Sequence, residues 1–225
     1  MKRDRTERAE RSNILDRLIL YWSSGRDVDG LWIGTWEDKP EPILRRIEAA
    51  LSLIKRYDRV RCDRLIRDLR RVWVLVLPTG LACFDHRIGA CEIDTRYFLA
   101  ATTTPELIAS TIVHEATHAR LWRLGFGYDE GLRPRIEAIC MRRQLAFAAK
   151  LPDGAPARDQ AERTLTLCAN RDYWRNAAFR ERHVEGSDEA LRYLGMPEWF
   201  IRIAHMRHSC AGYIKRGLRH AGPSY

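Results

Sequence analysis

The chain has 225 residues, of which 45% are hydrophobic and 31% charged. This composition excludes a disordered or fibrous protein and predicts one globular domain spanning residues 1–225. The formal net charge is +9, but the lysines and arginines alternate with acidic residues along expected helices, as on solvated surfaces, so the charge does not favour nucleic acid as the main partner.

The N-terminal segment and the absence of a membrane-spanning stretch predict the cellular compartment of the protein. Residues 1–13 are charged and no long apolar run follows them, so no secretory signal is predicted. No stretch is long and apolar enough to span a membrane. We therefore expect a cytoplasmic protein whose cysteines are reduced. The cysteines lack CxxC pairing and metal-ligand spacing, and are predicted to be small buried hydrophobic side chains. They are Cys62, Cys83, Cys91, Cys140, Cys168 and Cys210.

The first part of the chain, residues 1–70, is predicted to be helical. Apolar residues recur at helical spacing from Ser12 to Trp22 and from Ile43 to Tyr57, and a shorter helix is expected from Asp63 to Leu69. Between the first two, Asp29 to Pro42 mixes turn-forming residues with tryptophans. This stretch predicts an ordered loop.

Residues 71–150 are predicted to hold a small sheet and two helices. Val72 to Leu77 is β-branched and apolar on both faces, which indicates a buried central strand. Leu81 to Phe84 and Cys91 to Ile93 are shorter strand candidates. The best-delimited helix runs from Thr103 to Leu124, with Thr103 and Glu106 at capping-box spacing and a glycine after its last apolar residue.

After a loop, a further helix is expected from residue 134 to the Pro-Asp-Gly stop at 152–154. Helices are also predicted over residues 155–182, 188–194 and 197–208, with Gly186 and Gly195 as breaks, so residues 151–225 form a mainly helical C-terminal part. The order predicts an α+β fold in which the small sheet packs on the capped helix.

A His-Glu-x-x-His pattern, His114, Glu115 and His118, falls inside the capped helix. Residues four apart lie one turn above each other, so both imidazoles can bind one metal ion, predicted to be Zn²⁺. Glu115 points about 100° round the helix from His114 and can reach a metal-bound water. The pattern predicts that zinc activates this water and polarises a carbonyl, while Glu115 takes the proton and returns it to the leaving amine.

A catalytic zinc ion usually has three protein ligands, so a third is expected. Glu137 lies between Ile136 and Ala138 on an apolar stripe, where a buried carboxylate needs a partner such as a metal. A salt bridge to a nearby arginine is the other interpretation of Glu137. The loop residues Glu130 and Asp129 are rival ligands, although carboxylates in such positions more often cap a helix.

The segments Ile112–His118 and Arg135–Ala138 resemble the zincin metallopeptidases, specifically the gluzincin arrangement in which a downstream helix supplies a glutamate. The resemblance covers residues 103–150 and implies a zincin-like fold. It also implies zinc ligands and a general base, namely His114, His118 and Glu137 as ligands and Glu115 as base.

The sequence departs from related patterns in two places. Leu121 and Leu124 replace the glycine and final histidine of the longer metzincin motif, which argues against that group. Gluzincins often have an acidic residue four positions after the ligand glutamate, where it orients a histidine; here that position is Met141.

The resemblance further implies a strand that pairs with an extended peptide and a side chain that donates to the transition state. The strand Cys91–Asp94 is the candidate for pairing. Tyr128, His205, His208 and Tyr213 are the candidate donors. His205 and His208, three apart on one expected helix, could form a second metal site, but two ordinary histidines on a half-exposed face explain them better.

These features predict a zinc-dependent hydrolase, most simply a metallopeptidase acting on a peptide or protein substrate. Two alternatives remain at this point. One is a catalytically silent zincin-like domain used for binding or regulation, and the other is a basic nucleic-acid-binding module.

Overall fold

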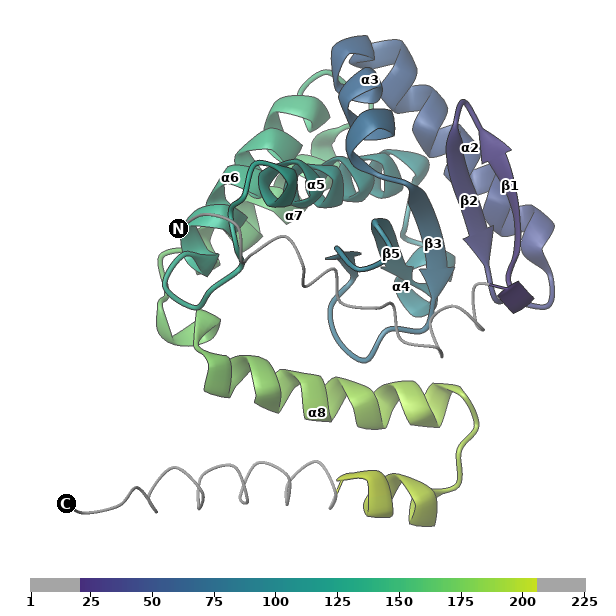
Figure 1. Cartoon of the computed structure of the whole chain (residues 1–225), viewed down its shortest axis with the longest axis vertical. Coiled ribbons are helices and arrows are strands. Elements are labelled where there is room, and N and C mark those ends of the chain that lie inside the picture. Colours follow the sequence, from purple (N-terminus) through teal and green to yellow (C-terminus); the bar gives the residue numbers. More distant parts are fainter. Residues whose placement is uncertain (1–20, 206–225) are drawn as a thin grey trace, which may run out of the picture.

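The computed structural model describes residues 21–205 and has an α+β architecture (Figure 1). Its five-stranded sheet has the order β1-β2-β3-β5-β4. β2, β3 and β5 run parallel, whereas the outer strands β1 and β4 are antiparallel to their neighbours. The strands are β1 Ser24–Val28, β2 Leu31–Thr35, β3 Arg71–Leu75, β4 Ala82–Asp85 and β5 Ala90–Asp94. The predicted α+β class with a small sheet is confirmed.

β3 is the buried central strand that its β-branched residues predict. Val72 and Val74 point to the face covered by helices, whereas Trp73 packs on the opposite face, because successive side chains of a strand alternate. β5 lies between β3 and β4 and is paired on both sides. The prediction that Cys91–Asp94 pairs with substrate is therefore wrong, and β4 is the strand at the edge.

The predicted loop from Asp29 to Pro42 is also wrong, because its first part belongs to a β-hairpin. Val28 pairs with Leu31, and the two residues between them, Asp29 and Gly30, have positive φ values of 54° and 84°. Such a pair fits the two-residue turn that matches strand twist. The Asp-Gly signal was present, but the tryptophans and glycines around it obscured the alternation.

Helices α2 (Pro40–Tyr57) and α5 (Pro105–Arg123) cover one face of the sheet, and α3 (Arg59–Asp68) packs against both of them. α2 and α3 begin a few residues before their predicted starts. The N-cap of α5 is Thr104, whose hydroxyl accepts from the Leu107 N–H, rather than the predicted Thr103. Thr103 instead donates to the Tyr97 carbonyl, after the short helix α4 (Thr95–Leu99), which the sequence did not predict.

The main core lies between these helices and the sheet, and it consists mainly of buried aliphatic side chains, with the phenylalanines Phe98 and Phe147 and two cysteines. Among its fully buried members are Ile33, Ile47, Ile54, Val72, Ile93, Phe98, Ile108 and Ile112. Of the helix predicted from Ser12 to Trp22, only the last two residues fall within the described part, and they are helical. No helix among residues 21–205 has the length and apolarity needed to cross a membrane.

The C-terminal part is helical, as predicted, but its boundaries differ. The helix expected over residues 155–182 is divided into α7 (Ala155–Leu167), a 3₁₀ turn (Asp172–Trp174) and α8 (Asn176–Tyr193). Trp174 fixes this division, since its ring N–H donates to the Leu167 carbonyl at 2.9 Å. Gly186, expected to break a helix, lies inside α8. Residues 198–205 are helical, and the rest of the helix expected over 197–208 is outside the described residues.

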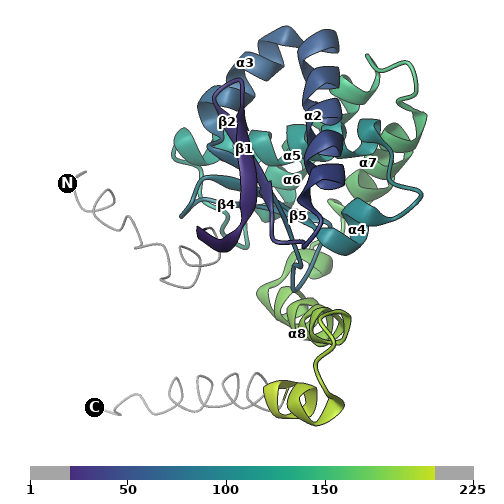
Figure 2. The ribbon, with the colours of Figure 1, turned by 90° about the vertical axis from the view of Figure 1, so that its right-hand side faces the viewer.

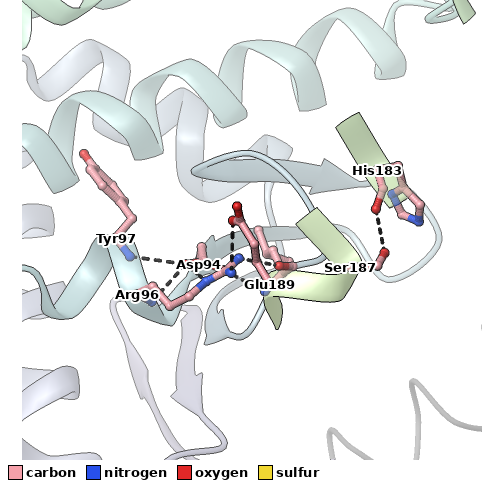
Figure 3. Close-up of polar contacts among 7 residues, drawn as sticks. Asp94, Arg96, Tyr97, His183, Ser187 and Glu189 are labelled. Atoms are coloured by element: carbon pink, nitrogen blue, oxygen red, sulfur yellow. Dashed lines mark hydrogen bonds and ion pairs between the residues drawn. The ribbon is translucent and has the colours of Figure 1, made fainter. Parts of the chain in front are cut away.

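α8 lies on the side of the molecule opposite to α3 (Figures 1 and 2). Asp94 at the end of β5 caps α4 and holds Arg96, whose guanidinium lies 4.0 Å from Glu189 of α8 (Figure 3). Gly186 packs so closely on the loop after β3 that a Cβ atom there would lie 2.0 Å from the Pro78 carbonyl oxygen. α8 is thus seated against the end of the sheet.

Candidate metal centre

A cavity of about 740 Å³ lies between the edge strand β4 and helices α5, α7, α8 and α6 (Arg133–Ala148). One wall comes from β4 and the loop before it, and the opposite walls come from the helices. His114, Glu115 and His118 of α5 all line this cavity, together with Tyr128 and Glu137. The structure therefore brings the predicted motif to a single concave site, which is where binding sites usually lie.

The two histidines project from one face of α5 and bring their ring nitrogens together. The Nε2 atoms of His114 and His118 lie 3.0 Å apart. His114 is 7% exposed, and the His118 side chain is 13% exposed. The middle of α5 is buried on almost every side, which explains why uncharged residues such as Ile112, Val113 and Ala116 surround the motif.

Glu137 of α6 reaches the same point from across the helix pair. Its carboxylate oxygens lie 3.4 Å from His114 Nε2 and 3.3 Å from His118 Nε2. Zinc ligands with bonds of about 2.0–2.1 Å lie about 3.3–3.4 Å apart in a tetrahedral site. The two distances to Glu137, each to a different carboxylate oxygen, match this separation, and the 3.0 Å between the imidazole nitrogens is slightly shorter. The rival Glu130 is exposed and does not line the cavity, and Asp129 contributes its carbonyl oxygen to the start of α6.

Gln144 orients His114 from the second turn beyond Glu137. The Nδ1 atom of His114 lies 3.1 Å from Gln144 Oε1, and Gln144 is 3% exposed. An N–H donated from Nδ1 leaves the lone pair of Nε2 free to face Glu137 and His118. The gluzincin pattern puts the orienting group at Met141, and Gln144 lies about one turn further along the same face of α6, where its position in the sequence is the signal that identifies it.

Tyr128 and Glu137 are directly bonded, since the tyrosine hydroxyl donates to Glu137 Oε1. The Tyr128 ring also packs edge-on against His118, with centroids 5.6 Å apart. Burial and the Glu137 charge raise the pKa of Tyr128 far above its usual range. Burial alone would raise the pKa of Glu137, but its contacts with both histidines lower it. Tyr128 is therefore a protonated donor beside an ionised carboxylate.

The Glu115 carboxylate accepts a hydrogen bond from the backbone of Phe84 in β4. It is 5% exposed, and burial raises its pKa to about 7, against the opposing effects of His114 and of a hydrogen bond from the Phe84 backbone. The negative charge of Glu137 adds to this rise in pKa, and among the described residues no cation forms an ion pair with Glu115. Its carboxyl thus lines the cavity as a group separate from the three possible ligands.

Cys140 is a further possible ligand that the sequence analysis placed among buried hydrophobic residues. It is fully buried, and its Sγ lies within 4.8 Å of ring nitrogens of His114 and His118. Cys140 follows Glu137 by three positions, so both lie on one face of α6. No cysteine spacing rule marks it, because its partners are histidines of another helix.

The other side chains predicted to donate to the transition state do not line this cavity among the described residues. His205 is exposed, lies beyond α8 and is paired with Asp188 at 2.7 Å. His208 and Tyr213 lie outside the described residues, so the structure does not test the second metal site that was weighed for His205 and His208 against two ordinary histidines.

Comparisons with models of protein families, with curated proteins and with solved structures give no match to this chain.

Proposed function

We propose that this chain is a zinc-dependent hydrolase that cleaves peptide bonds. The observation that carries the proposal is the group of two imidazoles and one carboxylate at the spacing of tetrahedral ligands, with the separate carboxyl of Glu115 in the same cavity. Nitrogen and oxygen ligands in this number suit Zn²⁺, and a site with three protein ligands keeps one position for water or substrate, as catalytic zinc sites do.

The residues around the cavity divide the chemical work. Zinc bound by His114, His118 and Glu137 would supply a Lewis acid for the substrate carbonyl and the attacking water. The Glu115 carboxylate accepts the proton of that water and returns it to the leaving nitrogen. Gln144 holds the ring of His114, and the Tyr128 hydroxyl holds Glu137.

The edge strand supports a peptide as the substrate. β4 is the last strand of the sheet, and Ala82, Cys83 and Phe84 from it line the cavity. An extended chain can add to such an edge through backbone hydrogen bonds. A peptide paired with β4 would pass along the wall opposite the histidines of α5.

Metal analysis of the purified full chain tests the site. After expression with added zinc, we expect about one equivalent of zinc, lost in a His118→Ala variant. His183→Ala removes an exposed histidine of α8 and should keep the zinc. Less than about a tenth of an equivalent in the unaltered protein would contradict the proposal.

Activity is tested separately with a library of random-sequence peptides and product detection by mass spectrometry. Glu115→Gln should retain zinc and lose hydrolysis by roughly 10²–10⁴-fold, because it removes the general base and leaves every proposed ligand in place. Equal product formation by Glu115→Gln and the unaltered protein would show that Glu115 is not the base.

Cys140 supports a second candidate function, a closed structural zinc site without hydrolysis. A site with four protein ligands has no position for substrate. The two candidates differ in the cobalt-substituted protein, because a bound thiolate gives a sulfur-to-cobalt band in the near ultraviolet. The hydrolase requires a spectrum without this band, unchanged in Cys140→Ser and altered in Glu137→Ala. A band that disappears in Cys140→Ser would establish the structural site.

A further inference from the structure

The cavity wall formed by α8 carries one guanidinium, that of Arg182. Arg182 is half-buried and lies over the Tyr173 ring at 3.9 Å and near the Phe179 ring at 5.2 Å. One of its N–H groups donates to the Tyr173 carbonyl at 2.9 Å. A guanidinium has five N–H donors in a fixed fork, so this anchor holds the side chain and leaves donors for another group.

No carboxylate within residues 21–205 forms an ion pair with Arg182. The cavity lining contains two acidic residues, Glu115 and Glu137, and both have roles at the metal centre. Much of the rest is apolar, including Leu167, Phe179 and Met141. A cation in such surroundings has lost part of its hydration, and a carboxylate partner would compensate for that loss.

A second arginine, Arg133, lies close to the aromatic side chains of this wall without lining the cavity. It is 7% exposed, and its guanidinium lies 4.5 Å from the Phe179 ring and 5.1 Å from the Tyr128 ring. Its bonds go to neutral oxygens, the Trp174 carbonyl and the Asn176 side chain. Two guanidinium groups thus flank Phe179 without a carboxylate among the residues bonded to them, and charges act over longer range in a partly buried site.

We propose that Arg182 binds a carboxylate of the substrate, so that the hydrolase selects peptides carrying an acidic side chain or a free C-terminal carboxylate beside the cleaved bond. This inference rests on the proposed function, because the carboxylate belongs to a substrate only if the chain hydrolyses peptides. The chain His118, Tyr128, Phe179 and Arg182 connects the two sites through successive ring contacts. Arg182 and the three possible ligands also line the same cavity, so a peptide bound in it can meet both.

The test compares matched peptides in hydrolysis and in binding. Each random-sequence library is made with a free or an amidated C-terminus, and with glutamate or glutamine as its fixed residue. We expect a preference of roughly 10- to 100-fold in kcat/KM for one carboxylate. Dependence on the terminal group identifies an exopeptidase-like site, whereas dependence on glutamate over glutamine identifies a side-chain pocket.

Arg182→Gln should abolish the preference, by lowering kcat/KM for the carboxylate-bearing peptides to the value that the same variant has for the neutral ones, and Arg182→Lys should restore part of it. Arg180→Gln, two positions earlier on the exposed face of α8, is the matched control and should keep the preference. Binding is measured in the zinc-loaded Glu115→Gln variant with four tripeptides. They are acetyl-Leu-Ala-Glu, its C-terminal amide, and the same pair with Gln in place of Glu. Arg182→Gln added to this variant isolates the role of the guanidinium.

The outcomes separate the two proposals. Hydrolysis without any acidic preference, equal in Arg182→Gln, overturns the carboxylate site and leaves the hydrolase. Binding of acetyl-Leu-Ala-Glu that depends on Arg182, without hydrolysis of any library, supports the carboxylate site and overturns the hydrolase. If the protein shows no hydrolysis of any library and no binding of the tripeptides, both proposals are overturned.

Discussion

Gln144 acts on the candidate metal only through His114. Its carbonyl oxygen lies 3.1 Å from the Nδ1 atom of His114 and is buried with it. A partner in this position fixes the ring orientation and increases the basicity of the nitrogen that faces the metal. The contribution of Gln144 to the site can therefore be measured as a change in metal affinity when Gln144 is substituted.

We predict that Gln144→Leu weakens zinc binding by about 10- to 100-fold, because His114 loses the acceptor for its Nδ1–H. Gln144→Glu keeps an acceptor and should bind zinc at least as tightly as the unaltered chain. Competition with a chromophoric chelator measures both affinities. An affinity in Gln144→Leu equal to that of the unaltered chain would remove Gln144 from the site.

At the scale of residues, the sequence was sufficient to predict those site residues whose spacing along a helix places them on one face. His114 and His118 share a helix face because they are four apart, and Glu137 stood out as a carboxylate on an apolar stripe. The structure places all three together. Gln144 and Cys140 were missed, since a neutral amide or a buried thiol on α6 becomes informative only once α6 is known to pack on α5.

At the scale of elements, Gly186 shows how α8 is held. A glycine inside an exposed helix is normally destabilising by roughly 0.5–1 kcal/mol relative to alanine. At Gly186 a Cβ atom would lie 2.0 Å from the Pro78 carbonyl oxygen, which belongs to the loop that leads to β4. The helix could accept the methyl group only by moving away from this loop.

We therefore predict that Gly186→Ala destabilises the protein, by about 1–3 kcal/mol, instead of stabilising it. Urea unfolding gives the free energy, and limited proteolysis within α8 reports whether the helix has lifted from the sheet. Glu185→Ala, at the neighbouring exposed position, is the control and should change stability little. A more stable Gly186→Ala protein would show that α8 does not rest on Pro78.

Asp58 joins α2, α3 and the end of α6. Its carboxylate accepts from the Arg61 N–H as the N-cap of α3, and it pairs with Arg61 and Lys150 at 2.9 and 2.8 Å. Burial opposes its ionisation, but the hydrogen bonds from Lys150 and Arg61 outweigh burial and lower the pKa of Asp58 below its ordinary value of 3.8. Ionised Asp58 is thus favoured in the folded state.

A carboxylate with a lowered pKa stabilises the fold above its unfolded pKa, and this contribution is lost as the pH falls through the lower folded value. We predict that Asp58→Asn, which keeps a good N-cap, reduces stability by up to about 1 kcal/mol near neutral pH, since Lys150 is half-exposed. The difference should shrink below pH 3.8. Asp58→Ala also loses the cap and should cost about 1 kcal/mol more. Urea unfolding across pH measures each effect, and a constant difference would exclude the charge as its cause.

Elements with strong local signals were predicted, and those that depend on distant contacts were not. β3 and α5 were found because a β-branched run and a capped apolar helix are recognisable alone. The hairpin of β1 and β2 was missed partly because β2 contains Gly34, which resembles a loop residue in the sequence. A glycine is needed there because a Cβ atom on residue 34 would lie 2.1 Å from the Trp32 ring. Gly186 indicates a helix break when only its neighbours in the sequence are considered, whereas it lies inside α8 because of its contact with Pro78, which is far away in the sequence.

At the scale of the whole molecule, the cavity depends on every layer of the fold. β4 forms one wall, α5 and α6 supply the possible ligands, and α7 and α8 close the other side. The possible ligands thus come from two helices that pack together through the core, and they cannot assemble in an unfolded chain. A metal that binds only the folded state stabilises it in proportion to its affinity and concentration.

We predict that zinc raises the melting temperature of the full chain. Free zinc at 100 times its dissociation constant adds about 2.7 kcal/mol, which for a chain of this size corresponds to roughly 5 to 11 °C. Calorimetry before and after chelation, with zinc restored to the chelated sample, measures the shift and its reversibility. His118→Ala should melt at one temperature with or without zinc, whereas His183→Ala should respond like the unaltered chain. A shift of equal size in His118→Ala would place the bound zinc elsewhere in the protein, because the ring that joins α5 to Glu137 would then be dispensable.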